Sequence, residues 1–399
     1  MKKILLLGGS AQQVVAIETA KRMGYATVLC DYLPDNPGRL AADRFYPVST
    51  TDRGAVLKIA AEERVDGVLA YASDPAAPTA AFVAQELGLP GTPLEAVEIL
   101  CNKHLFRKFL RENGFPSPEA RDYTDAAAAL REAQTLPYPL IVKPVDSSGS
   151  KGATVLRDST GLAGALDFAF SFSRCHRVIV ERFIERKHPF MVGGDIFVRD
   201  GEVILWGLLN CHRDSAVNAL VPVGKSWPLC LDAADEQHIR DTLSRLVRLL
   251  GIQNCAMNVE LMVDRDGAVW PVDIGPRCGG NMIPNLLGDM FGVDIVKMCI
   301  QAAMGERVDA AVQQASGCYA THNLHSSRAG RYRGVRFSEA LAPHLYRSCL
   351  YKSPGDPVEY FSNASKCLGI VFMRFEEEET MHAILSHINE HIEILLDPL

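Results

Sequence analysis

The sequence predicts a multidomain protein, α/β in its first hundred residues and α+β beyond them. Three observations support this prediction. Strand-like apolar runs alternate with helix-like stretches up to about residue 100, which is typical of a parallel, Rossmann-like sheet. Beyond that point, apolar runs joined by Asp-Gly turns indicate antiparallel hairpins. The length, 399 residues of which 48% are hydrophobic, is sufficient for two or three domains with cores of their own.

The first hundred residues alternate between strands and helices, predicted at residues 2–9, 11–24, 25–32, 52–65, 66–74 and 77–89. The glycines after the first strand, in "GGSAQQ", lack the GxGxxG spacing of a dinucleotide site, so a structural Rossmann-like domain is the better interpretation. Open parallel sheets bind ligands at the carboxyl ends of their strands. Ser10, Gln12, Ser73 and Asp74 stand at such ends, and we expect them to be able to line a ligand cleft.

Composition excludes several classes of protein. A net charge of -7 argues against a nucleic-acid surface, and no apolar run is long enough to span a membrane. The first apolar run, Ile4 to Leu7, is too short for the core of a signal peptide. The eleven cysteines are scattered singly without a CxxC pair, as in proteins of the reducing cytosol. We therefore expect a cytoplasmic protein without disulfides, nucleic-acid partner or membrane partner.

Beyond residue 101 the alternation is lost. Helices are predicted at 102–114, 161–172 and 235–252, a strand at 177–184, and hairpins at 195–209 and 255–275. The remaining tail is expected to combine short strands with one helix.

A glycine-rich loop joins two apolar runs between Tyr138 and Leu156. Lys143 ends the first run, and the loop "DSSGSKG" carries Lys151. A strand–loop–strand unit of this kind can present backbone N–H groups and ammonium groups to an anion. Its spacing differs from that of the P-loop, in which Gly-Lys-Ser/Thr precedes a helix.

The hairpin that begins at residue 255 brings two carboxylates into opposition. Alternation with period two puts Asn258 and Glu260 on the face opposite its apolar residues. If Asp264 pairs with Val269, Glu260 lies opposite Asp273, with Cβ atoms about 5 Å apart. Such carboxylates repel unless a cation lies between them, and oxygen ligands suit Mg²⁺ bound together with substrate phosphates. The alternative is that both are solvated on an exposed face, and a one-residue slip of register would separate them.

Arg277 follows this hairpin in "PRCGG". An arginine beside a metal-bound phosphate is suited to stabilise charge that develops during phosphoryl or acyl transfer. Gly279 and Gly280 would allow close approach of the backbone to a ligand. A plain turn explains the same segment equally well.

Taken together and in order, these segments resemble the ATP-grasp superfamily, in the branch of biotin carboxylase, carbamoyl-phosphate synthase and the carboxylate–amine ligases. The resemblance covers essentially the whole chain and is carried by "NKHLFRKFLRENGFPSP", "YPLIVKPVDSSGSKG", "VERFIE" and "NVEL…VDIGPRCGG". It implies a Rossmann-like domain at 1–100, a split ATP-grasp fold at 101–312 with a lid at about 138–205, and a small C-terminal α+β domain at 313–399.

The resemblance also implies roles for the matched residues. ATP is expected to contact Lys103, Lys143, Ser147, Ser148, Gly149, Ser150, Lys151, Gly152, Glu181, Arg182, Phe183, Ile184 and His188. The lysines and the loop would hold the phosphates, the segment around Glu181 the adenine, and His188 the ribose. Glu260 and Asp273 would bind Mg²⁺, with Mn²⁺ as an alternative ion, and Arg277 would be the catalytic arginine.

Substrate contacts are expected by position at His212, Arg213, Asn258, Gly279 and Gly280. For His212 and Arg213, which lie in a segment between the adenine strand and the metal hairpin, an ordinary surface loop is the alternative interpretation.

Two departures from the family pattern stand out. The family usually has Glu-x-Asn in the last metal strand, where this sequence has Asp273-Ile274-Gly275. The loss of the asparagine removes one oxygen ligand, so a second Mg²⁺ would be held more weakly or through water. The N-terminal "GGSAQQ" differs from the purine-pathway members, which weakens a purine assignment.

The implied reaction joins a small-molecule carboxylate to an amine. The carboxylate attacks the γ-phosphate of MgATP to form an acyl phosphate, and the amine then displaces phosphate to form an amide. A homodimer is the assembly that the resemblance suggests. One alternative is a bicarbonate-using carboxylase-type or purine-pathway enzyme, and another is a nucleotide-binding protein without activity. The lack of a biotin-carrier segment argues against the carboxylase-type enzyme. The retained charged residues argue against a protein without activity.

Overall fold

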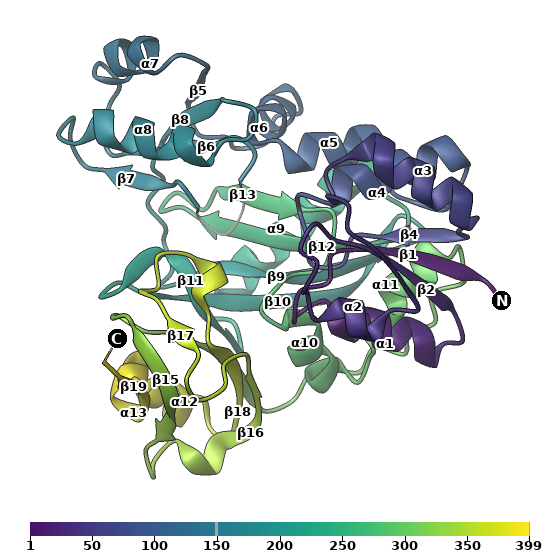
Figure 1. Cartoon of the computed structure of the whole chain (residues 1–399). Coiled ribbons are helices and arrows are strands. Elements are labelled where there is room, and N and C mark those ends of the chain that lie inside the picture. The colour runs from purple at the N-terminus through teal and green to yellow at the C-terminus, as the bar shows by residue number, and fades with distance from the viewer. Residues whose placement is uncertain (148–150, 399) are drawn as a thin grey trace.

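The computed structural model describes residues 1–147 and 151–398. Its N-terminal part is a parallel sheet in the order β3-β2-β1-β4 (Figure 1, purple). The strands are β1 (Lys3–Leu7), β2 (Ala26–Cys30), β3 (Arg44–Tyr46) and β4 (Gly67–Leu69). The helices are α1 (Val14–Arg22), α2 (Gly38–Ala41), α3 (Arg53–Glu63), α4 (Ala77–Leu87) and α5 (Leu94–Cys101). This confirms the predicted Rossmann-like sheet, and the apolar residues of β1 are buried on both faces, as helices on both sides require.

A second, antiparallel sheet has the order β5-β8-β6-β7 and forms the lid with its helices (Figure 1, top). Its elements are β5 (Ala120–Tyr123), α7 (Ala126–Ala133), β6 (Leu140–Pro144), β7 (Thr154–Leu156), α8 (Leu162–Phe172) and β8 (Val178–Arg182). This sheet and the predicted lid, about 138–205, differ at both ends. At one end, β5 pairs with β8, which lies more than fifty residues further along the chain. At the other end, the segment after residue 190 joins a different sheet. Neither pairing can be read from local periodicity.

The third sheet is the largest, with the order β13-β12-β9-β10-β11-β14-β18-β16. Its strands are β9 (Met191–Arg199), β10 (Glu202–Asp214), β11 (Asn218–Trp227), β12 (Cys255–Val263), β13 (Val269–Gly275), β14 (Cys318–Leu324), β16 (Leu345–Leu350) and β18 (Gly369–Phe375). Both predicted hairpins are present, as β9–β10 and β12–β13. The boundary expected at residue 312, between the ATP-grasp and C-terminal domains, falls within this sheet, because β14, β16 and β18 lie after it in the chain.

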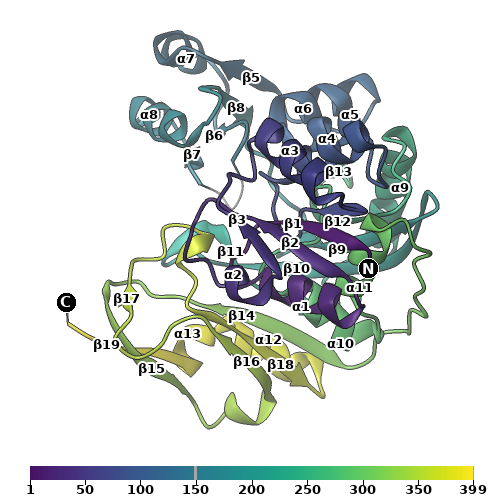
Figure 2. The same ribbon diagram turned by 45° about the vertical axis from the view of Figure 1, so that its right-hand side comes forward.

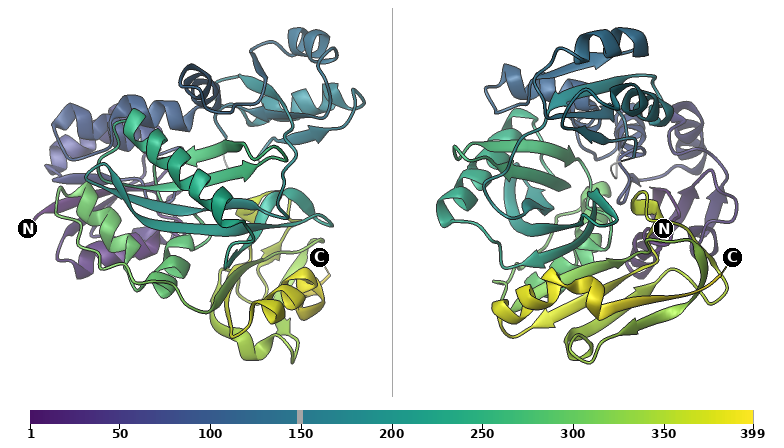
Figure 3. Two further views of the ribbon diagram at one scale, coloured as in Figure 1. Left: turned by 180° about the vertical axis from the view of Figure 1, so that it is seen from behind. Right: turned by 90° about the vertical axis from the view of Figure 1, so that its left-hand side faces the viewer.

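Helices cover the two faces of this large sheet. On one face, α6 (Lys103–Glu112) and α9 (Ala233–Leu249) share a core with Val259 and Ile196 (Figure 3). On the other, α10 (Ile283–Phe291) and α11 (Ile295–Ala303) share a core with Phe197 and with Ile4 of the N-terminal sheet. Figure 2 shows α1 of the N-terminal domain beside α11 on this second side. The strand ends of the first domain therefore meet the face that carries Glu260.

The C-terminal part adds a small sheet, β17-β15-β19 (Figure 1, yellow). It consists of β15 (Gly330–Phe337), β17 (Pro357–Val358) and β19 (Ile392–Asp397), accompanied by α12 (Glu378–Ser386), α13 (Ile388–His391) and the 3₁₀ turns η1 (Ala342–His344) and η2 (Ala364–Lys366). The tail thus has two α-helices rather than the single one expected. All eleven cysteines are free. None of the helices that the structure describes has the length and apolar character needed to cross a membrane.

Glycines allow the central strands to approach closely. Gly194 in β9 has a φ of +122°, and a Cβ added there would lie 2.0 Å from the carbonyl oxygen of Gly207 in β10. A side chain at this position would therefore be opposed both by the backbone conformation and by the neighbouring strand.

We expect Gly194→Ala to lower the free energy of unfolding by about 3 kcal/mol or more, because strain and overlap add. Gly24→Ala is the matched control: its φ is +87° but nothing lies within 4 Å of the added Cβ. Only backbone strain of about 1 kcal/mol should remain there. Urea unfolding followed by circular dichroism measures both, and equal losses would contradict close packing at Gly194.

Candidate functional site

Glu260 and Asp273 are ladder partners on neighbouring strands, as predicted. The register near the turn differs from the expected one, because Val263, not Asp264, pairs with Val269. A β-bulge between Glu260 and Leu261 leaves Val272 unpaired and shifts the register by one residue. The two carboxylates therefore face each other because of a bulge that the sequence pattern did not reveal.

Each of these carboxylates lies near one cation from a different element. Arg213 Nη2 is 3.6 Å from Glu260 Oε1, and Lys103 Nζ is 3.8 Å from Asp273 Oδ2. The side chains of Glu260 and Asp273 are 23% and 43% exposed, so water and ligands can reach their oxygens. Two accessible, loosely paired carboxylates that face each other are a donor set that fits a hard divalent cation shared with phosphate oxygens.

A buried triad lies behind this carboxylate pair. Glu181 on β8 accepts from Arg107 Nε at 2.7 Å and from Lys143 Nζ at 2.5 Å. Arg107 also donates to the carbonyl oxygens of Pro271 at 3.3 Å and Val272 at 2.8 Å. Sequence reasoning missed Arg107, although its position four residues after Lys103 on one helix was a usable signal.

Charge pairing dominates the electrostatics of this triad. Burial alone would raise the pKa of Glu181, but the charges of Arg107 and Lys143 outweigh burial and lower it to about 2. Burial also lowers the pKa of Lys143, against the opposing effect of Glu181. The carboxylate of Glu181, which was predicted to contact adenine, thus forms ion pairs with two cations. An ammonium group has three donors, so Lys143 keeps the capacity to bind a phosphate oxygen as well.

A cavity of about 200 Å³ opens between the lid and the β12–β13 hairpin. The predicted residues that line it are Lys103, Lys143, Ser147, Lys151, Glu181, Arg182, Phe183, Ile184, Arg213, Glu260 and Asp273. Phe183 and Ile184 are part of its apolar lining, and sequence reasoning missed the rest, which includes Ile141, Met191, Leu220, Met262 and Trp270. A cavity that combines apolar side chains with several cations can accept both the base and the phosphates of a nucleotide.

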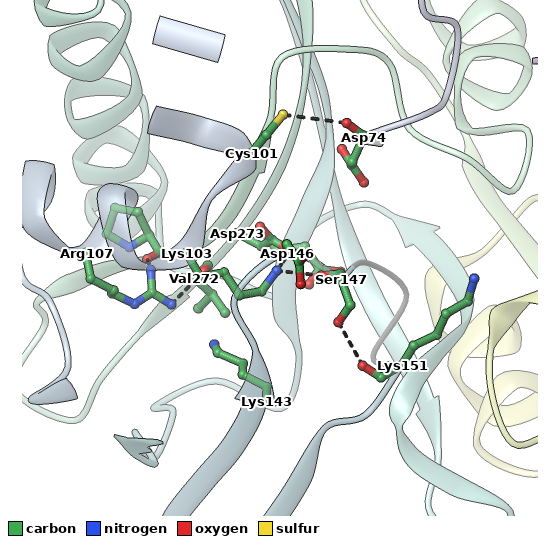
Figure 4. A network of polar contacts seen from close by, with 12 residues as sticks. Asp74, Cys101, Lys103, Arg107, Lys143, Asp146, Ser147, Lys151, Val272 and Asp273 are labelled. Atoms are coloured by element: carbon green, nitrogen blue, oxygen red, sulfur yellow. Dashed lines mark hydrogen bonds and ion pairs between the residues drawn. The ribbon is translucent and has the colours of Figure 1, made fainter. Parts of the chain in front are cut away.

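The phosphate-loop segment begins beside Lys103 (Figure 4). Lys103 Nζ donates to the carbonyl oxygen of Ser147 at 2.7 Å, and Ser147 Oγ donates to that of Lys151 at 2.8 Å. Figure 4 shows the side chain of Lys151 extending away from Lys103 and Lys143. Ser148, Gly149 and Ser150 lie outside the described residues. Gly152, with a φ of +75°, packs against Pro144 and is not among the cavity residues.

Two predicted histidines lie elsewhere. His188 Nε2 is 2.6 Å from Asp235 Oδ2 near the start of α9, and His188 is not among the cavity residues, so its contact with the ribose stays a prediction. His212 Nε2 contacts Ser226 Oγ at 2.8 Å. Because successive strand residues point to opposite faces, Arg213 reaches the cavity and His212 does not. Burial, followed by the charge of Lys225, lowers the pKa of His212 to about 4, so it is neutral at physiological pH.

Arg277 is bound to the N-terminal domain rather than to the cavity. Its Nε donates to Asp74 Oδ1 at 2.7 Å, its Nη2 donates to the other oxygen of Asp74, and its Nη1 donates to the Cys278 carbonyl at 2.9 Å. Burial opposes its charge, but Asp74 outweighs burial and raises the pKa of Arg277. A Cβ on Gly275 would lie 2.6 Å from Asp74 Oδ1. The carboxylate of Asp74 thus fills the space that an asparagine side chain at position 275 would need.

Three more of the predicted substrate residues, Asn258, Gly279 and Gly280, contact protein groups. Asn258 Nδ2 donates to Asp195 Oδ1 at 2.9 Å, and Gly279 N donates to both Asp195 oxygens at 2.8 Å. Gly280 lies near Gln12, whose Oε1 accepts from Asn281 N at 2.7 Å. Burial raises the pKa of Asp195 to about 6, despite these hydrogen bonds. Asn258 and Gly279 therefore hold the 276–281 loop on the sheet.

Lys225 on β11 is a candidate that sequence reasoning missed. It is 6% exposed, donates to Cys211 Sγ at 2.7 Å, and has no ion-pair partner among the described residues. A Cβ on Gly193, the ladder partner of Glu260, would lie 2.7 Å from Lys225 Nζ. The ammonium therefore lies over Gly193 on the sheet face that carries Glu260. A buried cation without a carboxylate partner is costly and suggests an anionic ligand.

Comparison with known proteins agrees with this geometry. Residues 102–311 match the family model "Carbamoyl-phosphate synthase L chain, ATP binding domain", and residues 17–91 match "ATP-grasp N-terminal domain". An uncharacterized protein of Sinorhizobium fredii is 27% identical over 80% of this chain, and the carbamoyl phosphate synthase large chain of Mycobacterium bovis is 24% identical over 86%. The alignments span 66% and 32% of those relatives' own lengths.

The fold is shared with solved structures. The L-amino acid ligase of Bacillus licheniformis superposes with a TM-score of 0.84, at 20% identity, over 100% of this chain and 99% of that one. The likeness extends across the N-terminal sheet, the lid and the large sheet, so the predicted split fold is confirmed.

We expect Glu181→Gln to lower the free energy of unfolding at pH 7 by about 3–5 kcal/mol, because Arg107 and Lys143 would lose their buried counter-charge. The folded pKa of Glu181, about 2, lies below its ordinary value of 4.5. Its stabilisation is therefore fully present above about pH 4.5 and is lost as the pH falls toward 2. The difference between wild type and variant should shrink by about 2 kcal/mol at pH 3.

Urea unfolding at pH 7 and pH 3 tests this expectation. Glu236→Gln is the control, since Glu236 pairs with Arg240 on the accessible face of α9 and its loss should cost less than about 0.5 kcal/mol. A pH-independent difference between wild type and Glu181→Gln would contradict the assigned ion triad.

Proposed function

The chain belongs to the carbamoyl-phosphate synthase L chain, ATP-binding domain family, and on that premise we propose that it is an ATP-dependent carboxylate–amine ligase. It would join a small-molecule acid to an amine and release ADP and phosphate. The observation that carries the proposal is the pair of facing carboxylates, Glu260 and Asp273, in the lining of a cavity with many apolar residues. The cations Lys103 and Lys143 line the same cavity.

The cavity supports ATP as the activating substrate. The apolar residues Ile141, Met262 and Trp270 suit the adenine, and the ammonium groups of Lys103 and Lys143 suit the phosphates. Glu260 and Asp273 would hold Mg²⁺, which supplies charge neutralisation at the phosphate oxygens when it is bound. The protein's own contribution is to fix the γ-phosphate in position and to exclude water.

The acid would bind on the sheet face beyond Glu260. Arg213 and Lys225 provide two positive charges there, on strands next to each other. A carboxylate held by them would lie beside the γ-phosphate, and its oxygen would attack phosphorus while ADP leaves. The amine nitrogen would then attack the acyl carbon, and phosphate would leave with the bonding electrons. We assign Arg277, held in place by Asp74, to the oxyanion that forms in this second step.

Amino acids are the first substrates to examine, because the solved structure with a TM-score of 0.84 is an L-amino acid ligase. Bicarbonate is the alternative acid, since the solved structures that share the fold include a biotin carboxylase domain in complex with MgADP and bicarbonate. We further propose a homodimer, which rests on the family resemblance, and a cytoplasmic location, which rests on the scattered cysteines.

Lys143→Met is expected to weaken MgADP binding about tenfold or more, because a buried charge-assisted hydrogen bond to phosphate is lost. The fold should persist, since Arg107 still pairs with Glu181. Lys108→Met is the matched control, as Lys108 is exposed on the same helix as Lys103. Isothermal titration calorimetry gives both affinities. Equal MgADP affinity in wild type and Lys143→Met would exclude this cavity as the nucleotide site.

Phosphate release from ATP, measured with pairs of amino acids and followed by mass spectrometry of the product, tests the ligase reaction. We expect Lys225→Met to raise the KM for the acid at least tenfold and to leave the KM for ATP unchanged. The exposed Lys297→Met should change neither constant. Phosphate release with bicarbonate alone would favour a carboxylase-type enzyme. Nucleotide binding without release from any pair would favour the non-catalytic alternative.

A further inference from the structure

Three side chains with metal-binding atoms meet between the loop that follows β11 and the C-terminal helix α12. Cys230 Sγ lies 3.7 Å from His382 Nε2, and His382 Nε2 lies 3.2 Å from Glu378 Oε1. All three ligand atoms lie within 4.8 Å of one another. None of these residues lines the nucleotide cavity. The cluster is therefore separate from the site proposed for ATP.

The spacing of these atoms matches the edges of a tetrahedron around one zinc ion. Zinc lies about 2.3 Å from sulfur and about 2.0–2.2 Å from nitrogen or oxygen, which sets the S···N edge at about 3.6 Å and the N···O edge at about 3.4 Å. The observed distances, 3.7 Å and 3.2 Å, are close to both. The third separation, from Cys230 Sγ to the Glu378 carboxylate, is within 4.8 Å, so adjustment of the side chains is sufficient for one ion to contact all three groups.

His382 Nε2 can make only one of its two contacts as a hydrogen bond at a time. It can donate to Glu378 when it carries a proton, or accept from the Cys230 thiol when it does not, but it cannot do both. A cation between them would serve all three.

Both halves of the cluster are held in place by other contacts. Asn210, 1% exposed, accepts from Cys230 N at 2.9 Å and donates to the Pro228 carbonyl at 2.7 Å, so it fixes the loop around Cys230. Glu378 and His382 are four residues apart on α12 and therefore lie on the same face of the helix. Ligands that are already positioned lose little conformational freedom when they bind an ion.

We propose that Cys230, Glu378 and His382 bind one zinc ion, with water as the fourth ligand. A thiolate and an imidazole select zinc over magnesium, which prefers an octahedron of oxygens. Binding releases the thiol proton of Cys230 to solvent and involves no change of oxidation state. The ion would fasten α12 to the segment between β11 and α9.

Zinc binding to the full-length protein, freed of metal by dialysis against a chelator, tests this proposal. Titration against a chromophoric zinc chelator should give one tight equivalent per chain. Cys230→Ser and His382→Ala should each weaken it at least a hundredfold. Cys175→Ser and His387→Ala are the matched controls, since both residues are exposed and lie outside the cluster. The zinc affinity of these two variants should equal that of wild type.

Cobalt substitution and thermal unfolding provide independent readouts. Cobalt bound to wild type should show thiolate-to-metal charge-transfer absorption, and Cys230→Ser should lack it. Zinc should raise the midpoint of thermal unfolding of wild type and leave that of Cys230→Ser unchanged. Glu378→Gln serves in case His382→Ala fails to fold. Absence of a tight equivalent in wild type, or equal zinc affinity in Cys230→Ser, would overturn the site, whatever the outcome for ATP.

Discussion

The ion triad of Glu181 with Arg107 and Lys143 is the interaction on which the rest of the structure depends. Arg107 comes from α6, Lys143 and Glu181 come from the lid sheet, and Arg107 also binds two carbonyl oxygens of the β13 strand. One buried carboxylate thus connects a helix, the lid and the hairpin that carries Asp273. Because loss of Glu181 would leave two buried cations without a counter-charge, the relative position of these three elements is strongly constrained.

Charges in this protein differ according to how completely they are paired. Glu181 is buried and contacts two cations at short distance, so its charge serves the architecture. Glu260 and Asp273 are more exposed and lie 3.6 and 3.8 Å from their cations, so their oxygens remain available to a ligand. Lys225 is the opposite case, a buried cation that donates to a thiol instead of a carboxylate. Incomplete pairing, rather than charge itself, distinguishes the groups that we assign to substrates.

The N-terminal domain contributes to the site through its strand ends. Asp74 holds Arg277 and occupies the space beside Gly275, while Gln12 binds the backbone of the following loop. Glycine at position 275 is therefore a consequence of how two domains meet: a side chain there would overlap Asp74. Gly275 stands where the family has a metal-binding asparagine, and in the structure it is part of the contact between the two domains.

The sequence by itself determined the alternation of strands and helices in the first hundred residues, the two hairpins and the order of the motifs, because these follow from local periodicity and from Asp-Gly turns. It also put Glu260 opposite Asp273, although by a register that was one residue off at the turn. Only the tertiary structure decided the bulge at Val272, the triad partner Arg107, the direction of His212 and the contact of Arg277 with Asp74, which are 203 residues apart. Such features depend on strand pairing and on charges from distant segments, and neither leaves a periodic trace in the chain.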